Sequence, residues 1–327
     1  MLISIVVLSY NRPVQVERIL KNFVGVTAND FNIIIKDDVS PLRFEIEEIV
    51  DRYSKQLNVE VLFHSNESNM GYDGNLISSF SITDSEYVFL LSDDDYLLGS
   101  EMESIVRTIK NSRSDFYFTP YIENGEVKRV PSGNYVSDKF SNIIYNSILF
   151  SGLVYRVGAV NSLVLDYEFL SKCIYSQVYL ALALIYKNKS YGVLPSSALY
   201  LGGDGDNFFG KNESAVNSDL LSDRKKVTSD LLYQQFLLKV VDKISTDFDP
   251  NILISFKKEY SIRLVSYGLR VRGKGYKAYF SFLKTYFGSV DRHFILPTLL
   301  FLVFFIFPSK VSRNIYNIGV KRLRKSG

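Results

Sequence analysis

Three consecutive acids, Asp93, Asp94 and Asp95, follow the apolar run YVFLL at residues 87–91, with only Ser92 between them. Carboxylates packed this densely repel one another, and burial beside an apolar segment adds to the cost. Such acids can cap a helix or perform general acid–base catalysis, but capping needs only one of them. A divalent cation uses several carboxylate oxygens and offsets their repulsion. On an extended segment, Asp93 and Asp95 would point to the same side and share one cation, which would attract phosphate oxygens.

Polar clusters follow three other apolar runs in the first third of the chain. They are SYNR at 9–12, KDDVSP at 36–41 with the acids Asp37 and Asp38, and SNESNMGYDGN at 65–75. The two acids would accept hydrogen bonds from a base or a ribose, or cap the helix expected near residue 42. The glycines of NMGYDGN allow either close backbone approach to a ligand or an ordinary turn.

The elements that must position these clusters alternate between strands and helices. Strands alternating with helices form a mostly parallel sheet with helices on both faces, and such sheets bind ligands at the carboxyl ends of their strands. The sequence therefore predicts an α/β fold with all four polar clusters at one rim of the sheet. We predict strands over 3–8, 31–36, 59–63 and 87–91, and helices over 13–24, 42–56 and 72–82.

The remainder of the chain is predicted to be less regular at first and then helical. A glycine-rich loop, GGDGDNFFG at 202–210, separates the two parts. We therefore predict a domain over 1–212 and a helical region over 213–327. The expected strands are 115–122, 125–131, 151–156 and 191–194, and the expected helices are 167–187, 214–243, 251–270 and 275–288.

Basic residues are concentrated at the C-terminal end. Thirteen of the 38 Lys and Arg residues but one of the 35 acids, Asp291, lie from residue 260 onwards, which leaves 25 bases against 34 acids before it. Segment 294–307, FILPTLLFLVFFIF, is almost purely apolar but shorter than the roughly twenty residues that a membrane span needs. The basic stretch KVSRNIYNIGVKRLRK follows, with apolar residues near one helical face: Val311, Ile315, Ile318 and Leu323.

This C-terminal pattern predicts docking on the anionic inner leaflet of a membrane without crossing it, because a basic amphipathic segment adjoins an apolar one. The apolar run favours lipid over nucleic acid as the anionic partner. A core helix of a soluble oligomer is the alternative interpretation of 294–307.

The single cysteine, Cys173, excludes an internal disulfide and fits a reducing compartment. It lies in an apolar helical pattern, so we expect a buried inert thiol. The N-terminal run MLISIVVLSYNR lacks a basic leading region, and we expect a first strand there instead of a signal peptide. The absence of GxxxxGK[ST], and of GxGxxG after the first strand, argues against a nucleotide hydrolase and a dinucleotide enzyme.

The series SIVVLSYNRP, IIIKDDVS, NMGYDGN and YVFLLSDDD, in this order and with these gaps, resembles the pattern of glycosyltransferase family 2 on the GT-A fold. The resemblance covers about residues 1–110, and the combination is specific although each piece alone is not. The variant is most similar to sugar transferases of bacterial surface-polysaccharide assembly of the abequosyltransferase-like type. The resemblance implies a Rossmann-like GT-A domain, with a nucleotide-sugar-binding half at 1–110 and an acceptor half at 111–212.

The resemblance also implies transfer of a sugar from a nucleotide-sugar donor to an acceptor hydroxyl, with Mn²⁺ or Mg²⁺ as cofactor. Together with the predicted membrane docking, it implies a polyprenyl-linked glycan acceptor at the cytoplasmic face of the bacterial inner membrane, in capsule or O-antigen-type synthesis. By position, Asp93 and Asp95 would be the metal ligands. The donor nucleotide would be bound by Ser9, Tyr10, Arg12, Asp37, Asp38, Gly71, Asn75 and Asp94.

The catalytic base is where this chain departs from the family. Many inverting members carry a Glu-Asp pair after the metal motif, whereas the comparable stretch CIYSQVYLALAL has no acid at Ser176 or Gln177. The candidates are Asp204 and Asp206 in the glycine-rich loop, because a base must reach the acceptor hydroxyl. Two other functions stay open: a nucleotidyltransferase, which would release pyrophosphate, and a non-catalytic membrane-bound partner of a polysaccharide assembly complex, which would explain a missing base.

Overall fold

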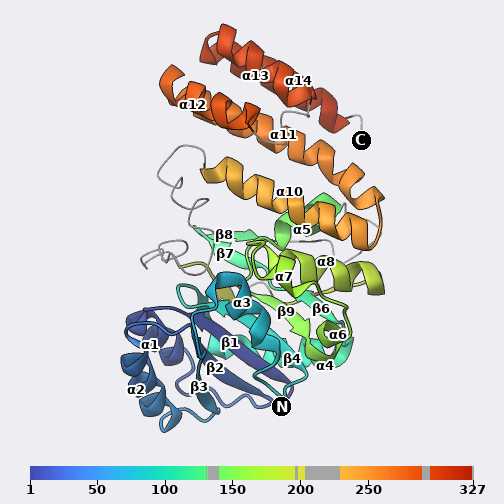
Figure 1. The fold of residues 1–327 in the computed structure, drawn as a ribbon. Coiled ribbons are helices and arrows are strands. Elements are labelled where there is room, and N and C mark those ends of the chain that lie inside the picture. The colour runs from blue at the N-terminus through green and yellow to red at the C-terminus, as the bar shows by residue number, and fades with distance from the viewer. Residues whose placement is uncertain (130, 132–139, 196–197, 203–228, 289–294, 326–327) are drawn as a thin grey trace. The chain divides into compact units, whose positions relative to one another are not determined.

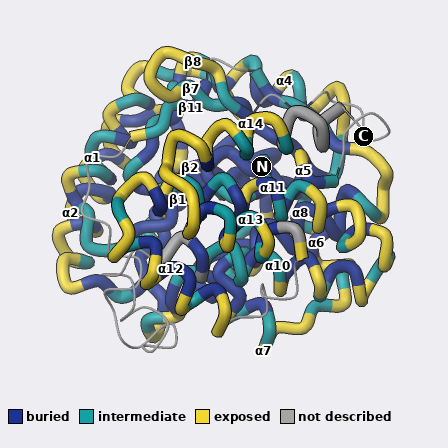
Figure 2. The backbone as a smooth tube through the Cα atoms, turned by 90° about the horizontal axis from the view of Figure 1, so that it is seen from above, coloured by how far each residue is buried: buried dark blue, intermediate teal, exposed yellow. Residues whose placement is uncertain are grey.

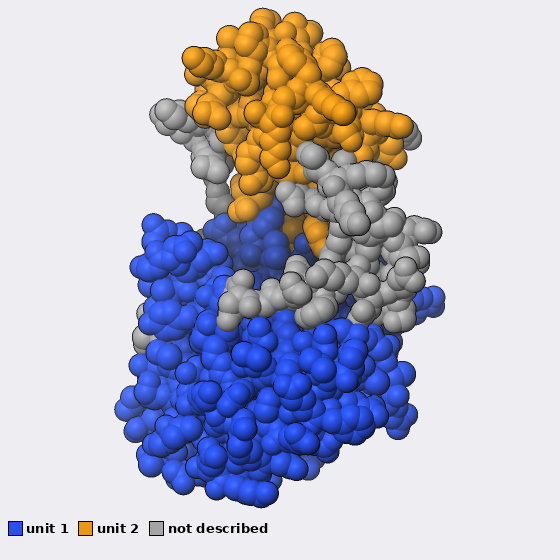
Figure 3. Space-filling view, turned by 90° about the vertical axis from the view of Figure 1, so that its left-hand side faces the viewer, with its two compact units in different colours: residues 1–216 blue, residues 217–327 orange. Residues whose placement is uncertain are grey.

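The computed structural model describes residues 1–129, 131, 140–195, 198–202, 229–288 and 295–325. The chain forms two compact units, residues 1–216 and residues 217–327, drawn in blue and orange in Figure 3. The division predicted from the sequence, between residues 212 and 213, falls in segment 203–228, which lies outside the described residues.

Unit 1 is built on a seven-stranded sheet in the order β10-β6-β9-β4-β1-β2-β3 (Figure 1). Strands β1, β2, β3 and β4 pair in parallel, and β9 runs antiparallel to both of its neighbours. The predicted α/β architecture with a mostly parallel sheet is therefore confirmed. The strands are β1 (Ile3–Ser9), β2 (Phe31–Asp37), β3 (Val61–Ser65), β4 (Tyr87–Ser92), β6 (Phe116–Phe118), β9 (Leu153–Arg156) and β10 (Gly192–Val193).

Both faces of the central strands are buried, which explains why their sequences are continuously apolar instead of alternating. On one face, odd-numbered residues such as Ile5, Ile33 and Phe89 form a single core with the apolar sides of three helices. The three are α1 (Pro13–Lys21), α2 (Arg43–Ser54) and α4 (Met102–Ser112). In helices α1 and α2 the buried residues recur every three to four positions with more exposed residues between them, as in amphipathic helices (Figure 2).

A second, four-stranded sheet has the order β5-β11-β7-β8. The strand predicted over 115–122 is consequently two strands: β6 joins the large sheet and β7 joins the small one. Antiparallel pairing of β7 with β8 confirms the expected strand pair. The strands are β5 (Tyr96–Leu97), β7 (Tyr121–Glu123), β8 (Glu126–Lys128) and β11 (Leu199–Tyr200).

The helix predicted over 167–187 is wrong in its first half, because the chain is interrupted between α7 (Tyr167–Leu170) and α8 (Ser176–Asn188). The buried Asp73 carboxylate accepts hydrogen bonds from the backbone N–H groups of Ile174 (2.6 Å) and Ser176 (3.2 Å). These N–H groups therefore bond to a side chain instead of to a preceding turn of helix. Cys173 lies in this interruption and is buried, as expected of an inert thiol. The remaining short helices of unit 1 are α3 (Gly71–Ile77), η1 (Ser78–Phe80), η2 (Gly99–Glu101), α5 (Phe140–Asn146) and α6 (Val157–Asn161).

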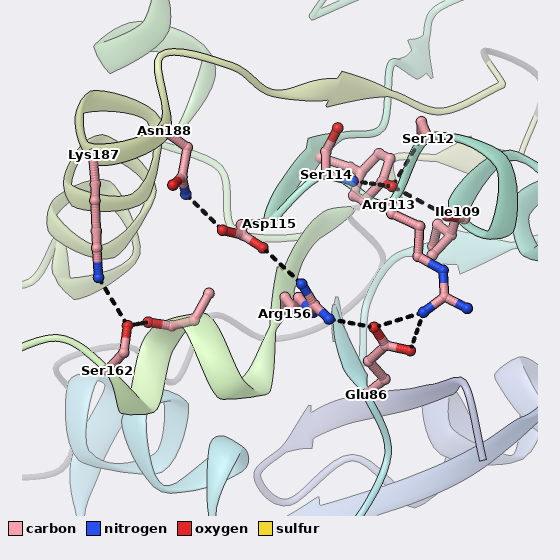
Figure 4. A network of polar contacts seen from close by, with 12 residues as sticks. Glu86, Ile109, Ser112, Arg113, Ser114, Asp115, Arg156, Ser162, Lys187 and Asn188 are labelled. Atoms are coloured by element: carbon pink, nitrogen blue, oxygen red, sulfur yellow. Dashed lines mark hydrogen bonds and ion pairs between the residues drawn. The ribbon is translucent and has the colours of Figure 1, made fainter.

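A network of exposed ion pairs connects elements at the amino end of β4 (Figure 4). Glu86 contacts Arg113 at 2.9 Å and Arg156 at 3.0 Å. Arg156 also contacts Asp115 at 3.4 Å, and Asp115 accepts a 2.6 Å hydrogen bond from Asn188. The network therefore ties strands β4 and β9 to helix α8 on the edge of the sheet opposite the polar clusters.

Unit 2 consists of helices, as predicted. On one side of α13, Phe301 and Phe304 are buried, and the Tyr279 hydroxyl donates a 2.8 Å hydrogen bond to the Phe301 carbonyl. Gly268 makes room for Phe301, since a Cβ there would lie 2.2 Å from its ring. No helix in the described part of the chain is long and apolar enough to cross a membrane. The helices are α10 (Ser229–Asp247), α11 (Asn251–Gly273), α12 (Tyr276–Phe287), α13 (Ile295–Ile306) and α14 (Ser309–Lys325).

Candidate active site

The three consecutive acids lie in a turn, not on an extended segment. Strand β4 ends at Ser92, and the Asp95 N–H donates a 3.2 Å hydrogen bond back to the Ser92 carbonyl. We call residues 92–95 the acid turn. The premise that Asp93 and Asp95 lie on an extended segment, which would make them point to the same side, is therefore wrong. The chain turns there because β5, which follows at once, pairs with β11 in the second sheet.

Arg12 is the counter-ion of two of these acids. Its Nη1 lies 2.6 Å from Asp93 Oδ1 and 3.2 Å from Asp94 Oδ2. The Asp93 carboxylate also accepts a 3.2 Å hydrogen bond from the Tyr10 N–H. Burial raises the pKa of Asp93 to about 6, against the opposing effect of the Arg12 charge. The Asp94 side chain is 30% exposed and that of Asp93 is 6% exposed, so Asp94 is the more accessible of the two.

Asp95 is held separately from Asp93, by the start of the glycine-rich loop. Its Oδ1 accepts a 3.1 Å hydrogen bond from the Gly202 N–H, and burial raises its pKa to about 6, while the Ser151 hydroxyl acts to lower it. A Cβ on Gly202 would lie 1.5 Å from the Asp94 carbonyl oxygen. Only glycine fits at this position, so the loop begins directly against the acid turn.

Ser9 Oγ, at the end of β1, and Asn11 Oδ1, just after it, are buried and have no hydrogen-bond partner within the described residues. Buried polar atoms are normally paired, and an orphan usually indicates a missing ligand, water or ion. Ser9 also links the two halves of the rim, since its carbonyl accepts a 3.2 Å hydrogen bond from the Asp38 N–H. These two oxygens therefore point to a ligand site beside the acid turn.

Asp38 organises the second half of the rim. Its carboxylate accepts hydrogen bonds from the N–H groups of Met70 (2.8 Å) and Gly71 (2.9 Å) and from the Asn66 side chain (2.7 Å). Gly71 has φ +68°, a conformation that favours glycine. Asp38 therefore fixes the backbone of segment 66–71 at the start of α3.

Asp37, the neighbour of Asp38, bonds locally instead. Its two carboxylate oxygens accept hydrogen bonds from the Ser40 N–H (2.8 Å) and the Ser40 hydroxyl (2.6 Å). Burial raises the pKa of Asp37, and the Ser40 hydrogen bonds oppose that effect. The carboxylate of Asp37 thus closes the turn that leads into α2.

Asn75 and Lys36 form the base of this half of the rim. Lys36 donates to Asn75 Oδ1 (2.5 Å), the Asn75 carbonyl (2.9 Å), Asn66 Oδ1 (3.0 Å) and Ser78 Oγ (2.7 Å). We call Lys36, Asp38, Asn66, Asn75 and Ser78 the Lys36 cluster. Lys36 was missed by the sequence analysis, although a lysine within the apolar run FNIIIK was an available signal.

The structure thus gathers the predicted donor-binding residues into two adjoining groups. Tyr10 and Arg12 contact the acid turn, and Asp38, Gly71 and Asn75 meet around Lys36. The Ser9 carbonyl accepts from the Asp38 N–H and so joins the two groups. The two proposed bases, Asp204 and Asp206, lie outside the described residues.

Two other buried charged residues near the rim were also missed. Asp73 joins α3 to the segment before α8, and burial raises its pKa to about 6. Arg129 donates to three backbone carbonyls, and burial lowers its pKa to about 10. One of these carbonyls belongs to Ser151, whose hydroxyl accepts a 3.0 Å hydrogen bond from the Ser92 N–H. Arg129 therefore supports the acid turn indirectly, through Ser151, although nothing in its sequence context indicated this.

A divalent cation fits the acid turn only together with further ligands. The described residues contain no group of three or more acid, histidine or cysteine side chains that could hold a metal ion. Mg²⁺, however, is usually held by one or two carboxylates and completed by water and substrate phosphates. The donors here are carboxylate oxygens, and a cation would favour the ionised form of acids whose pKa burial has raised. The residues therefore fit a hard cation shared with a phosphate-bearing ligand.

Comparison with known proteins agrees with this arrangement. Residues 4–159 match the family model described as Glycosyl transferase family 2. Abequosyltransferase RfbV of Salmonella typhimurium is 28% identical over 127 residues, which are 38% of this chain and 37% of that protein. The chain spans less than two fifths of the length of this and two further curated relatives, both named as uncharacterised glycosyltransferases.

Solved structures share the fold over a larger part of the chain. The S. aureus TarS 1-349 fragment in complex with UDP-GlcNAc is 16% identical, with a TM-score of 0.52 over 84% of this chain and 83% of that one. A mannosyltransferase from Pyrobaculum calidifontis, in complex with GDP-Man and Mn²⁺, is 9% identical, with a TM-score of 0.50 over 97% and 86%. At these identities the likeness shows the GT-A glycosyltransferase fold.

Proposed function

We propose that the protein moves a sugar from a nucleotide-sugar donor to a lipid-linked glycan acceptor, because residues 4–159 match the family model described as Glycosyl transferase family 2. One observation carries this proposal: the Arg12-clamped acid turn lies beside two buried oxygens, on Ser9 and Asn11, that lack partners within the described residues. Both features stand at the carboxyl ends of parallel strands, where α/β sheets bind their ligands.

Each group of residues has a distinct role in the proposal. Ser9, Tyr10 and the Lys36 cluster shape the nucleotide pocket, and the half-exposed Asp94 reaches the donor. Asp93 and Asp95 are the proposed ligands of Mn²⁺ or Mg²⁺, the cations that suit carboxylate oxygens. When bound, the cation would supply positive charge to the diphosphate as it leaves. Solved relatives bound to UDP-GlcNAc, or to GDP-Man and Mn²⁺, support this assignment.

The proposed base is Asp204 or Asp206, which would take the proton of the acceptor hydroxyl. Two facts about the described residues support looking there. Gly202, two residues before Asp204, donates to Asp95 at 3.1 Å, so the loop starts at the acid turn. Of the two nearest acids before α8, Asp166 caps α7 by accepting a 3.1 Å hydrogen bond from the Phe169 N–H, and Glu168 lies 3.8 Å from Lys172 with its side chain 88% exposed.

We propose that unit 2 docks on an anionic lipid surface. The side of α13 opposite Phe301 carries large apolar side chains that are between 46% and 76% exposed. They recur at helical spacing and form one stripe, which we call the α13 stripe: Ile295, Leu299, Leu302 and Ile306.

The charges around the α13 stripe fit the same partner. Helices α12, α13 and α14 contain no acid, and the sequence of α14 carries six basic residues. An exposed apolar stripe among cations matches an interface with acyl chains below and anionic headgroups around it. The proposed location is therefore the cytoplasmic face of the inner membrane, with a polyprenyl-linked acceptor in capsule or O-antigen-type synthesis.

The test is thermal unfolding of the full chain with UDP, GDP, CDP and dTDP, with and without Mn²⁺. We expect one nucleotide to raise the midpoint in a Mn²⁺-dependent manner, because preferential binding stabilises the folded state. The Asp93→Asn Asp95→Asn variant should lose the Mn²⁺-dependent part. Absence of a shift with all four nucleotides would contradict the donor site and favour a non-catalytic partner.

Product analysis separates the remaining alternative. With the matching nucleotide-sugar and a membrane extract as acceptor source, a glycosyltransferase releases the nucleotide. Release of pyrophosphate, instead, would identify a nucleotidyltransferase and contradict the proposed function.

A further inference from the structure

Lys36 is a fully buried lysine whose ammonium contacts only uncharged oxygens. It has 0% exposed surface, and its four acceptors come from Asn66, Asn75 and Ser78. No ion pair joins it to a carboxylate among the residues that the structure describes. A buried cation without a direct counter-ion is costly, so such a residue is retained where its position matters to function.

The bonds of Lys36 reach the parts of the chain that shape the proposed nucleotide pocket. Lys36 lies on β2, Asn66 follows β3, and Asn75 and Ser78 lie in α3 and η1. Asn66 passes the connection on, since its Nδ2 donates to Asp38 Oδ1 at 2.7 Å and to Asn75 Oδ1 at 2.9 Å. Asp38 in turn holds the N–H groups that begin α3. The Lys36 ammonium on β2 therefore holds three parts of the chain together: the segment after β3, helix α3 and helix η1.

This inference rests on the proposed function. We propose that Lys36 is a positioning residue for the donor: as an ammonium it fixes segment 66–71 and helix α3 in the shape that binds the nucleotide, without contacting the nucleotide itself. Its effect should therefore fall on donor affinity, and the rate at saturating donor should change much less.

The environment makes this role depend on pH. Burial lowers the pKa of Lys36 to about 8, and the charge of Asp38 acts in the opposite direction. Among the described residues, His64 on β3 is the other titratable group that faces Lys36. Burial and the charge of Lys36 both lower the pKa of His64. Neutral Lys36 offers one donor fewer to its four acceptors, so the cluster should loosen as the pH rises above about 8.

The experiment measures the dissociation constants of UDP, GDP, CDP and dTDP for the full chain by calorimetry, from pH 6.5 to pH 9.5. For the nucleotide that binds, affinity should weaken as the pH rises through the Lys36 pKa. Lys36→Met should weaken binding about tenfold or more at pH 7 and remove this dependence on pH. Lys21→Met, at an exposed lysine on α1, is the matched control and should behave as the wild type.

A second variant should shift the pH dependence of nucleotide affinity to higher pH. Ser78 is partly exposed and contacts Lys36 at 2.7 Å, so Ser78→Asp brings a carboxylate to the ammonium and raises its pKa. The alkaline loss of affinity should then move upward by about one pH unit. Ser81→Asp adds the same charge at an exposed serine of the following turn and should leave the profile unchanged.

The outcomes separate the two claims. If the wild type binds none of the four nucleotides, the proposed function fails before Lys36 is tested. If the wild type binds one, and Lys36→Met binds it equally well with the same pH profile, the positioning role is refuted. If Lys36→Met does not fold, Ser78→Asp decides: a profile shifted upward supports the role, and a profile identical to that of Ser81→Asp overturns it.

Discussion

Asp95→Asn should make the protein more stable at neutral pH while removing metal-dependent donor binding. Burial raises the pKa of Asp95 from its ordinary value of 3.8 to about 6. A shift of about two units corresponds to about 3 kcal/mol of free energy that the ionised form costs the folded state. Because the folded-state pKa is the higher one, this cost is absent below about pH 4, grows as the pH rises towards 6, and is complete at pH 7.5.

Asparagine removes the charge but loses part of the hydrogen bonding. Its single oxygen can still accept from the Gly202 N–H or from the Ser151 hydroxyl, whereas its amide N–H₂ group can accept from neither. An unmatched buried donor costs about 1–2 kcal/mol. The net gain at pH 7.5 is therefore about 1–2 kcal/mol, which raises the unfolding midpoint by about 2–8 °C for a unit of this size.

Thermal unfolding of wild type and Asp95→Asn at pH 4 and pH 7.5, without metal, measures this difference. We expect stabilisation at pH 7.5 and, at pH 4, where the charge cost is absent, destabilisation by up to about 1–2 kcal/mol from the unmatched amide donor. Asp94→Asn is the control, because that side chain is 30% exposed and paired with Arg12 at 3.2 Å, so removal of its charge should not stabilise the protein at pH 7.5. Equal effects of Asp95→Asn at the two pH values, or destabilisation at pH 7.5 alone, would refute the reasoning. Nucleotide with Mn²⁺ should then stabilise the wild type and leave Asp95→Asn unchanged.

Three further predictions test other parts of the structure. Gly202→Ala should destabilise the protein by about 1–3 kcal/mol in urea unfolding, because the added Cβ would overlap the acid turn. Gly158→Ala is the control and should not destabilise it, because Gly158 has open space around it. Asp73→Ala leaves two buried N–H groups without their acceptor and should cost about 2–4 kcal/mol in the same assay, so an unchanged midpoint would disprove the bracing of α8. Leu302→Glu should lower binding to vesicles containing anionic lipid in flotation experiments, whereas Ile254→Glu, on α11, should not, although Ile254 is 66% exposed and Leu302 is 46% exposed. Equal loss with both variants would argue against the α13 stripe.

The sheet and its rim could be predicted because the relevant signals are local. Each central strand is a continuous apolar run, since both of its faces are buried, and each run ends in polar residues. The carboxyl ends of parallel strands meet at one edge, so polar clusters that lie far apart in sequence could be assigned to one site. Ser9 at the end of β1 and Asp38 just after β2 are indeed joined by a backbone hydrogen bond of 3.2 Å.

The geometry within the rim could not be predicted, because distant residues determine it. Asp93 and Asp95 face different partners because β5 pairs with β11, about a hundred residues further on. The interruption before α8 depends on the carboxylate of Asp73, which lies in a different element from the helix it shortens. Lys36 resembles a strand residue near a surface, and only the three-dimensional arrangement shows that Asn66 and Asn75 surround it.

The distribution of charge between the two edges of the sheet argues independently for the position of the site. At the amino edge, Glu86 and Arg113 are exposed and directly paired, an arrangement that contributes to stability and requires little desolvation (Figure 4). At the carboxyl edge, Asp93, Asp95 and Lys36 are buried, and burial moves their pKa values towards neutrality. A fold selected for stability alone would place these charges at the surface. Their concentration at one edge is expected where charge must act on a ligand, and it therefore supports a donor diphosphate and cation at that edge.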